Sequence, residues 1–327
     1  MYQAPRITVG ALGLAICATA AAAQEIDRTG WPDAISVATA SQGGTYFVYG
    51  NGWANLVGET LGLSAGGEVT DGPVQNAALV QTGDVEFGMV TMGPVYDAWT
   101  GNSPLAPGVK MDQLRAVFPM YQTSFMFIAL ESSGIDSVDD LRGRTVGVGP
   151  AGGTPGTYLP QILEALGIEA EIQYGGADDQ AGQVQDGLLD AFGFAAGIPF
   201  PAFSQLEAQV PVNIFAFTAE EQAALLEAFP SLSAFTVPAD TYQSTDEDLL
   251  SVSMWNFAIA NASVPESLVY EVTRIVMEDN ARMVQIHSAA SETLPENYIH
   301  NSFLPWHPGA VRWFEENGYD IPDDLEG

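Results

Sequence analysis

Three glycine-rich turns hold the residue types whose spacing could bind a ligand. They are Gly43-Gly44-Thr45-Tyr46, Gly72-Pro73-Val74-Gln75-Asn76 and Gly149-Pro150-Ala151-Gly152-Gly153-Thr154, and each is predicted to open a helix. A helix N-terminus presents free backbone N–H groups and a partial positive charge, so it can hold a carboxylate without any cationic side chain. A capped helix start with no ligand is the alternative for each turn taken alone.

Polar side chains beside two of these turns could complete such a site. Thr45, Thr154 and Thr157 could add hydroxyl groups, whereas Tyr46 and Tyr158 could each add a ring and a phenol. Two such turns occupy matching places in two similar stretches of the chain. This correspondence favours a ligand held between them.

Residues for other chemistries are scarce. Cys17 is the only cysteine and Lys110 the only lysine, so the chain has no Gly-Lys-Ser/Thr phosphate loop and no thiolate metal site. His287, His300 and His307 do not form a close ligand pair at helical spacing. We therefore expect no catalytic residues, no metal site and no cofactor.

The charge balance is strongly acidic. Asp and Glu number 41 against 9 Lys and Arg, a formal net charge of −32. Nucleic-acid binding is excluded on this ground, because a phosphate backbone requires a basic surface. One hypothesis for the acidity is adaptation to saline surroundings, where salt screens the self-repulsion, and the alternative is a soluble acidic protein with no such adaptation.

The N-terminus has the layout of a secretory signal peptide. Arg6 precedes an apolar run from Ile7 to Ala23 that ends in three alanines, and the polar Gln24 follows. We predict cleavage of residues 1–23 and a periplasmic mature chain. A buried N-terminal helix or a membrane anchor is the alternative.

Short apolar strands alternate with helical stretches in two places, 34–100 and 144–216. This alternation predicts α/β units on a mostly parallel sheet. The stretch 124–130 reads as one strand crossing between the two, and 232–237 as a second. A helix predicted over 265–286 would return to the first unit.

Two crossings predict two α/β lobes joined by a hinge. Lobe one comprises 24–122 and 237–327, and lobe two comprises 123–236. Two independent domains in sequence order are the alternative, but no linker-like stretch supports it.

The order of several short motifs resembles the TAXI family, the TRAP-associated extracytoplasmic immunogenic solute-binding proteins. These motifs run over nearly all of the mature region and include Gly43-Gly44-Thr45-Tyr46, Gln75-Asn76, Gly83-Asp84-Val85, Pro119-Met120-Tyr121, Asp140-Leu141-Arg142-Gly143-Arg144, Val146-Gly147-Val148-Gly149, Gly187-Leu188-Leu189-Asp190-Ala191-Phe192 and His307-Pro308-Gly309-Ala310. The resemblance implies a type II periplasmic-binding-protein fold with ligand in the cleft. It also implies that a small carboxylate, such as glutamate or a related dicarboxylate, is delivered to a TRAP membrane permease. Tyr46, Tyr158 and nearby apolar residues would also tolerate a bulkier or aromatic acid.

The resemblance also implies that the ligand is bound by Thr45, Tyr46 and Asn76 in lobe one and by Thr154 with its glycine turn in lobe two. Together with the polar neighbours of the turns, the candidate ligand-binding residues are Thr45, Tyr46, Gln75, Asn76, Thr91, Gly153, Thr154, Thr157, Tyr158, Gly197 and Pro199.

The sequence departs from the family pattern at two prolines. Pro73 stands where the family often has serine, and Pro155 lies in Gly152-Gly153-Thr154-Pro155-Gly156-Thr157, where the family often has Gly-Ser-Gly-Thr. Each removes a backbone N–H, so the ligand of known members does not carry over directly.

Two other functions stay open. A binding protein of an ABC importer has a similar fold, and an enzyme could use the same two lobes. The enzyme would need a nucleophile or a cofactor lysine, which the chain does not offer in a suitable place. We expect a monomeric binding protein whose partners are a small organic acid or amino acid and the membrane permease.

Overall fold

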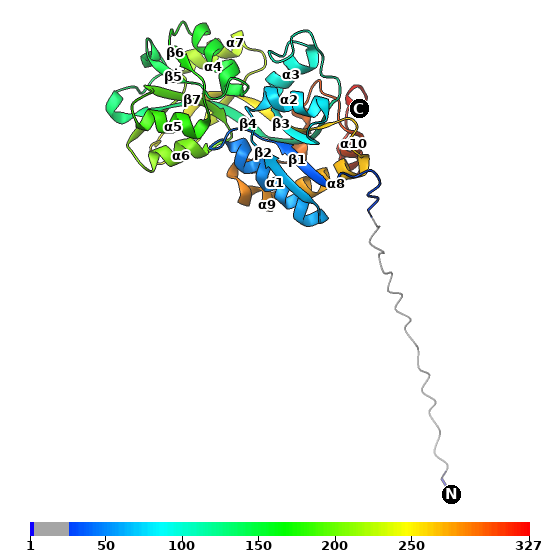
Figure 1. Ribbon diagram of the computed structural model, residues 1–327. Helices are drawn as coiled ribbons and strands as arrows, with labels where there is room; N and C mark the ends of the chain where they lie inside the picture. The colour runs from blue at the N-terminus through cyan, green and yellow to red at the C-terminus, as the bar shows by residue number, and fades with distance from the viewer. Residues whose placement is uncertain (3–25) are drawn as a thin grey trace.

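The computed structural model describes residues 1–2 and 26–327. The predicted signal peptide, residues 1–23, lies outside the described residues apart from its first two. Figure 1 shows two groups of helices and strands set side by side, joined by strands that run through both. Within the described ranges, no helix combines the length and the apolarity needed to cross a membrane.

The first half of the molecule begins with a parallel strand–helix unit. Its elements are β1 (Ala34–Ala38), α1 (Thr45–Leu61), β2 (Ser64–Glu68), α2 (Pro73–Thr82), β3 (Phe87–Thr91) and α3 (Met92–Thr100). Strand β1 lies between β2 and β3 and is parallel to both. The predicted strand at the start of this half and the two helices after the glycine turns are confirmed.

The second half repeats this arrangement. Its elements are β5 (Thr145–Gly147), α4 (Thr154–Ala165), β6 (Glu171–Gln173), α5 (Ala177–Gln185), β7 (Ala191–Ala196), α6 (Pro201–Glu207), β8 (Val212–Phe215), α7 (Ala219–Ala228) and β9 (Ser233–Val237). Strand β5 is parallel to β6 and β7. The α/β units predicted from the alternation are thus confirmed.

Two long antiparallel strands, β4 (Leu114–Leu130) and β10 (Leu249–Asn261), connect the halves. The main sheet order is β2-β1-β3-β10-β4-β7-β5-β6. Strand β4 pairs with β7 in the second half, and β10 pairs with β3 in the first. The prediction of a mostly parallel sheet is wrong, because the pairs β3–β10, β4–β10, β9–β10, β4–β7 and β4–β8 are antiparallel.

The prediction that 232–237 forms the second crossing is wrong. That segment is β9, and it pairs with the start of β10 inside the second half. The crossing is β10 itself, which is long enough to pair with β9 near Leu249 and with β3 near Asn256. Val237 also packs in a hydrophobic cluster of the second half, so the boundary lies within β10 rather than at 237.

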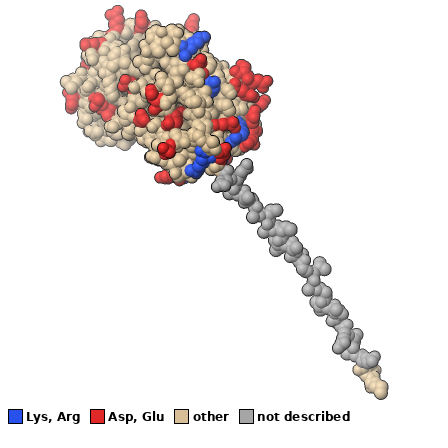
Figure 2. All heavy atoms as spheres, turned by 45° about the vertical axis from the view of Figure 1, so that its right-hand side comes forward, with Lys and Arg blue, Asp and Glu red and all other residues tan. Residues whose placement is uncertain are grey.

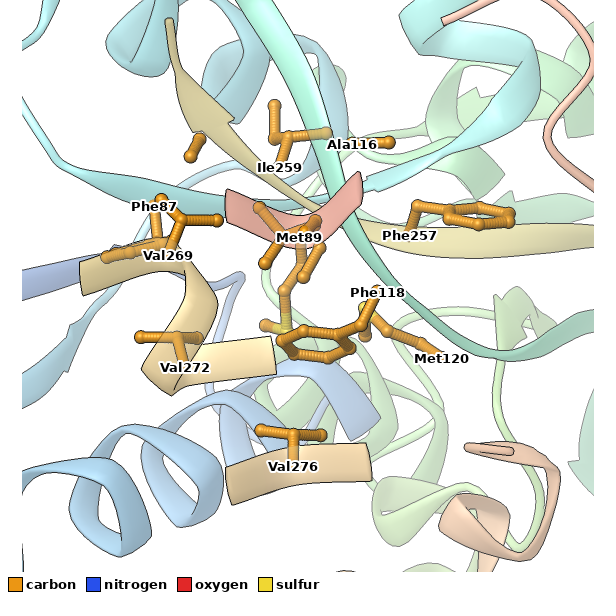
Figure 3. Packing of buried hydrophobic residues seen from close by; sticks show 14 of the residues in the cluster. Phe87, Met89, Ala116, Phe118, Met120, Phe257, Ile259, Val269, Val272 and Val276 are labelled. Atoms are coloured by element: carbon orange, nitrogen blue, oxygen red, sulfur yellow. The ribbon is translucent and has the colours of Figure 1, made fainter. Parts of the chain in front are cut away.

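The C-terminal part returns to the first half through α8 (Glu266–Glu278), α9 (Asn280–Ile286) and α10 (Pro308–Glu316). The single helix predicted over 265–286 is two helices, because the chain turns at Asp279, whose carboxylate accepts the backbone N–H of Arg282. Figure 3 shows Val269, Val272 and Val276 of α8 facing Met89 and Phe118 of the sheet. This packing fixes the first half as one hydrophobic core.

The surface carries the acidic excess. Figure 2 shows Asp and Glu side chains spread over the visible face, with few Lys and Arg side chains among them. Several arginines pair with these carboxylates, as Arg142 does with Asp139 and Arg312 with Glu266. Exposed pairs of this kind contribute only about 0–1 kcal/mol each to stability.

Candidate functional site

A cavity lies between the two halves, where the N-termini of α1 and α4 approach each other. Its volume is about 30 Å³. Thr45, Tyr46 and Thr91 line it from the first half, and Gly153 and Thr154 from the second. The structure therefore brings five of the candidate residues together in one place.

The N-terminus of α1 forms one wall of the cavity. Gly43 adopts a positive φ of 78°, a conformation that favours glycine, and Gly44 is the N-cap. Because glycine has no side chain, it cannot cap the first-turn N–H groups as serine or aspartate would. The N–H groups of Thr45 and Tyr46 thus belong to the part of the helix that has no partner in its own ladder.

The N-terminus of α4 forms the facing wall. Gly153 is its N-cap, again with no side-chain cap, and Pro155 occupies the first turn. Proline is well tolerated there, but it leaves one N–H fewer for a ligand. The N–H groups that remain are those of Thr154 and Gly156.

Several hydrogen bonds cross from one half to the other and hold the cleft shut. The backbone N–H of Val74 donates to the carbonyl of Gly152 at 3.1 Å, and the N–H of Ala202 donates to the carbonyl of Gly43 at 3.2 Å. The Thr45 hydroxyl donates to the carbonyl of Gly197 in the other half at 2.7 Å. The structure is thus a closed form of the cleft.

The N-terminus of α2 is used in this closure rather than left for a ligand. Pro73 has no N–H, and the next N–H, that of Val74, is bonded to the Gly152 carbonyl. A Cβ on Gly72 would lie 3.1 Å from the Cα of Gly153, so the two glycine turns touch. The predicted turn at Gly72 is therefore a contact between halves.

Candidate residues outside the cavity have other partners. Asn76 is fully buried and donates to the carbonyls of Thr39 and Met89, which ties α2 to β1 and β3. Gln75 accepts the N–H of Asp71 and lies in an outer groove. These two contacts stabilise the turn and the sheet.

The remaining candidates also lie beside the cavity. The Thr157 hydroxyl donates to Gly153 O within its own helix, and the carbonyl of Pro199 lies 3.1 Å from Nε2 of His287. The carbonyl of Gly197 accepts the Thr45 hydroxyl proton. Thr157, Pro199 and Gly197 do not line the cavity, and the bond to Gly197 contributes to the closed form.

Tyr158 packs against the first half at the edge of the cleft. A Cβ on Gly93 of α3 would lie only 2.2 Å from its phenol oxygen. Burial raises the pKa of Tyr158 to about 12, and the nearby carboxylate of Asp97 adds to the rise. The phenol is therefore neutral at physiological pH and acts as a packing surface.

Electrostatically, the cavity lacks cations. Among the described residues that line it, Asp71 is the only charged one, at the mouth where the cavity meets the outer groove. A ligand carboxylate would consequently depend on backbone N–H groups. The groove beyond is bordered by the exposed side chains of Val69 and Tyr174, one from each half.

Sequence reasoning missed Asn256, the residue with the most hydroxyl partners near the cavity. Its Oδ1 accepts from Tyr46 at 2.6 Å and from Thr91 at 3.0 Å, and it lies 3.0 Å from the Thr123 hydroxyl. A buried amide in the apolar run of β10 was the available signal, because a buried polar group needs hydrogen-bond partners. Thr123, also missed, lines the cavity.

The site offers little for catalysis or for metal binding. In the ranges 1–2 and 26–327, no three His, Cys, Asp or Glu side chains gather closely enough to hold a metal ion. His307 accepts the N–H of Gly309 and caps α10. What the cavity does offer is hydroxyl groups and the free N–H groups of two helix starts.

The fold is that of periplasmic binding proteins. The periplasmic binding protein BugD superposes with a TM-score of 0.56 at 12% identity, over 89% of this chain and 99% of its own. A periplasmic transporter protein gives 0.52 at 13% identity, over 80% and 87% of the two chains. An ancestral arginine-binding protein bound to arginine gives 0.51 at 12% identity, over 79% and 97%.

The sequence comparison is more specific than these distant structural likenesses. Residues 37–318 match the NMT1-like family, a range that includes both halves, both crossing strands and every candidate site residue. The chain belongs to the NMT1-like family.

Proposed function

We propose that this protein is a periplasmic solute-binding protein of the TAXI type, which captures a small organic acid between its two halves and delivers it to a TRAP permease. The observation that carries the proposal is the closed cleft with the N-termini of α1 and α4 on facing walls. In this account the protein is an exported monomer and has no catalytic role. The motif order supports the TAXI assignment within the NMT1-like family.

Ligand binding shifts an equilibrium between open and closed forms. Bonds such as Val74 N–H to Gly152 O close the cleft, and a carboxylate bridging the two helix starts would add differential affinity for the closed form. Such a group would meet backbone N–H donors in a site with little water. Hydrogen bonds to charged groups contribute about 1.5–3 kcal/mol each.

Thermal unfolding and solution scattering test the proposal with defined probes. The probes are succinate, L-glutamate, 2-oxoglutarate and benzoate, with succinamide and benzamide as uncharged controls. We expect at least one acid to raise the melting temperature and reduce the radius of gyration, and its amide to do neither. No response to any of the acids would overturn the proposed function.

A pair of variants at Thr45 tests the role of the backbone. Thr45→Pro removes one N–H at the first position of α1, where proline suits the helix geometry, and also removes the hydroxyl. Gly44 before it is already extended, with φ −84° and ψ 151°, as a residue before proline should be. Thr45→Val removes only the hydroxyl and is the matched control.

We expect Thr45→Pro to bind the acid about 10–100-fold more weakly than Thr45→Val, because it lacks an N–H to a charged group. Equal affinities in the two variants would show that the Thr45 N–H does not bind the ligand. The neighbouring genes test the transporter class: a permease without an ATPase fits TRAP, and an ATPase fits an ABC importer.

A further inference from the structure

Asn256 occupies the point where the two halves meet. It lies on β10 directly opposite Thr91 of β3, and its side chain is fully buried. Phe257, Ala258 and Ile259 follow it in the strand and are buried too. An amide in such surroundings is costly unless all its donors and acceptors are used.

The orientation of this amide follows from one neighbour. One end of the Asn256 amide lies 2.6 Å from the backbone carbonyl of Tyr121, and a carbonyl oxygen can only accept. That end must therefore be the Nδ2 amino group. The Oδ1 end then faces the hydroxyls of Tyr46 and Thr91.

The remaining hydrogen-bond donors and acceptors of the Asn256 amide can be assigned in turn. Nδ2 has a second hydrogen, and the Thr123 hydroxyl oxygen lies 2.8 Å from it. The same oxygen lies 3.0 Å from Oδ1, so the hydroxyls of Tyr46, Thr91 and Thr123 compete for its two lone pairs. Thr123 accepts from Nδ2, and its own proton goes into the cavity when Tyr46 and Thr91 occupy Oδ1.

The threonine hydroxyls at the two helix starts have no proton to spare in this arrangement, whereas Ser41, which also lines the cavity, accepts the N–H of Ala177. When Thr91 gives its proton to Asn256, Thr154 is the donor at the 2.7 Å contact across the cleft, where either hydroxyl could donate. The Thr45 proton goes to the Gly197 carbonyl. The hydroxyls of Thr45 and Thr154, expected from the sequence to be ligand donors, are thus committed to other groups in the closed form.

We infer that Asn256 is a positioning residue: its Oδ1 takes the protons of Tyr46 and Thr91, its Nδ2 donates to Thr123, and Thr123 is left as the buried side-chain hydroxyl that donates to the ligand. Thr123 lines the cavity and is itself buried, so its proton points into a space shielded from solvent. The inference rests on the proposed function for the existence of a ligand. Its arrangement of protons holds in the ligand-free protein.

Binding measurements test the role of Thr123. The probe is whichever of succinate, L-glutamate, 2-oxoglutarate or benzoate gives the largest thermal shift with the unaltered protein. We expect Thr123→Val, which keeps the shape but has no donor, to bind it about tenfold or more weakly. Thr123→Ser restores the hydroxyl, so it should bind within about threefold of the unaltered protein.

The serine rescue separates donation from packing. A loss of affinity that Thr123→Ser fails to restore, or an unchanged affinity in Thr123→Val, would overturn the role of Thr123. If none of the acids binds the unaltered protein, the proposed function fails, and the arrangement of protons is decided by the ligand-free measurement that follows.

Neutron diffraction from deuterium-exchanged, ligand-free crystals shows these protons directly. We expect deuterons from Nδ2 of Asn256 toward Tyr121 O and Thr123 Oγ1, from Thr91 toward Asn256 Oδ1, and from Thr123 into the cavity. Thr91, Thr123 and Asn256 belong to the paired strands β3, β4 and β10, so their protons can be located in a crystal of the open or the closed form. A Thr123 deuteron on Asn256, or a Thr91 deuteron on Thr154, would overturn the inference.

Discussion

The hydroxyl oxygens of Thr91 and Thr154 lie 2.7 Å apart and come from opposite sides of the cleft. Thr91 ends β3 in the first half, and Thr154 begins α4 in the second. Thr91 is also bonded to Asn256 on the crossing strand. One hydroxyl pair thereby links both binding surfaces to the strand about which they would move.

Gly93→Ala is predicted to hinder closure without touching the ligand. The new Cβ would lie 2.2 Å from the Tyr158 phenol oxygen in the other half, and overpacking of this kind costs about 1–3 kcal/mol. We expect a larger radius of gyration and about tenfold weaker acid binding, since closure becomes less favourable. Scattering and calorimetry measure the two effects.

Two further variants control the Gly93 experiment. Adding Tyr158→Phe removes the clashing oxygen and should restore part of the affinity. Gly182→Ala, also within a helix, meets no atom within 4 Å and should leave binding unchanged while stabilising the fold. Normal closure and binding in Gly93→Ala would show that the contact does not limit closure.

Asn76→Ala is predicted to destabilise the fold and to leave the intrinsic affinity for the acid intact. Its amide joins the carbonyls of Thr39 and Met89, and its Oδ1 accepts the Thr70 hydroxyl, all of them buried. Leaving such groups without partners costs about 1–3 kcal/mol each. Urea unfolding should show a loss of several kcal/mol, whereas a large drop in affinity below the unfolding transition would return Asn76 to the ligand site.

Much of the fold was predictable because its signals are local. The turn at Gly43-Gly44 marked the start of α1, and alternating apolar strands and helices marked the two parallel units. Strand β2 gave no such signal, since Ser64-Ala-Gly-Gly-Glu68 is neither apolar nor alternating. Its position is set by pairing along β1, which is a tertiary effect.

The site was predictable only in part for the same reason. Backbone turns located Thr45, Tyr46 and Thr154 in the cavity, because helix starts are visible in sequence. Asn256 depends on which strand crosses next to Thr91, and the crossing itself was assigned to the wrong segment. The directions of the Tyr46 and Thr91 hydroxyl protons depend in turn on Asn256.

Acidification is predicted to remove stability through His307. Burial lowers the pKa of His307 to about 4 from its ordinary 6.5, and the Arg115 charge adds to the decrease. Because the folded pKa is the lower one, protonation favours the unfolded chain. The contribution of neutral His307 is complete above pH 6.5 and is lost as the pH falls toward 4, in total about 3 kcal/mol.

His307→Asn isolates this effect, because asparagine also caps a helix N-terminus and does not titrate. Urea unfolding of both proteins from pH 7 to pH 4 should show the unaltered protein losing about 3 kcal/mol more than the variant. Parallel pH curves would mean that His307 does not titrate in this range.

Salt is predicted to stabilise the protein. A net charge of −32 produces self-repulsion that grows as the Debye length lengthens from about 3 Å at 1 M salt to about 30 Å at 0.01 M. The free energy of unfolding should therefore rise with sodium chloride, and an equally osmotic amount of glucose should not reproduce the rise. Full stability in very dilute buffer would contradict the saline-adaptation hypothesis.

A crystal structure of the protein with the tightest-binding acid tests the central claim most directly. The account predicts a carboxylate oxygen about 3 Å from the backbone N–H of Thr45, Tyr46 or Thr154, with the cleft closed around it. An acid seated in the outer groove between Val69 and Tyr174, or paired with an arginine, would contradict it.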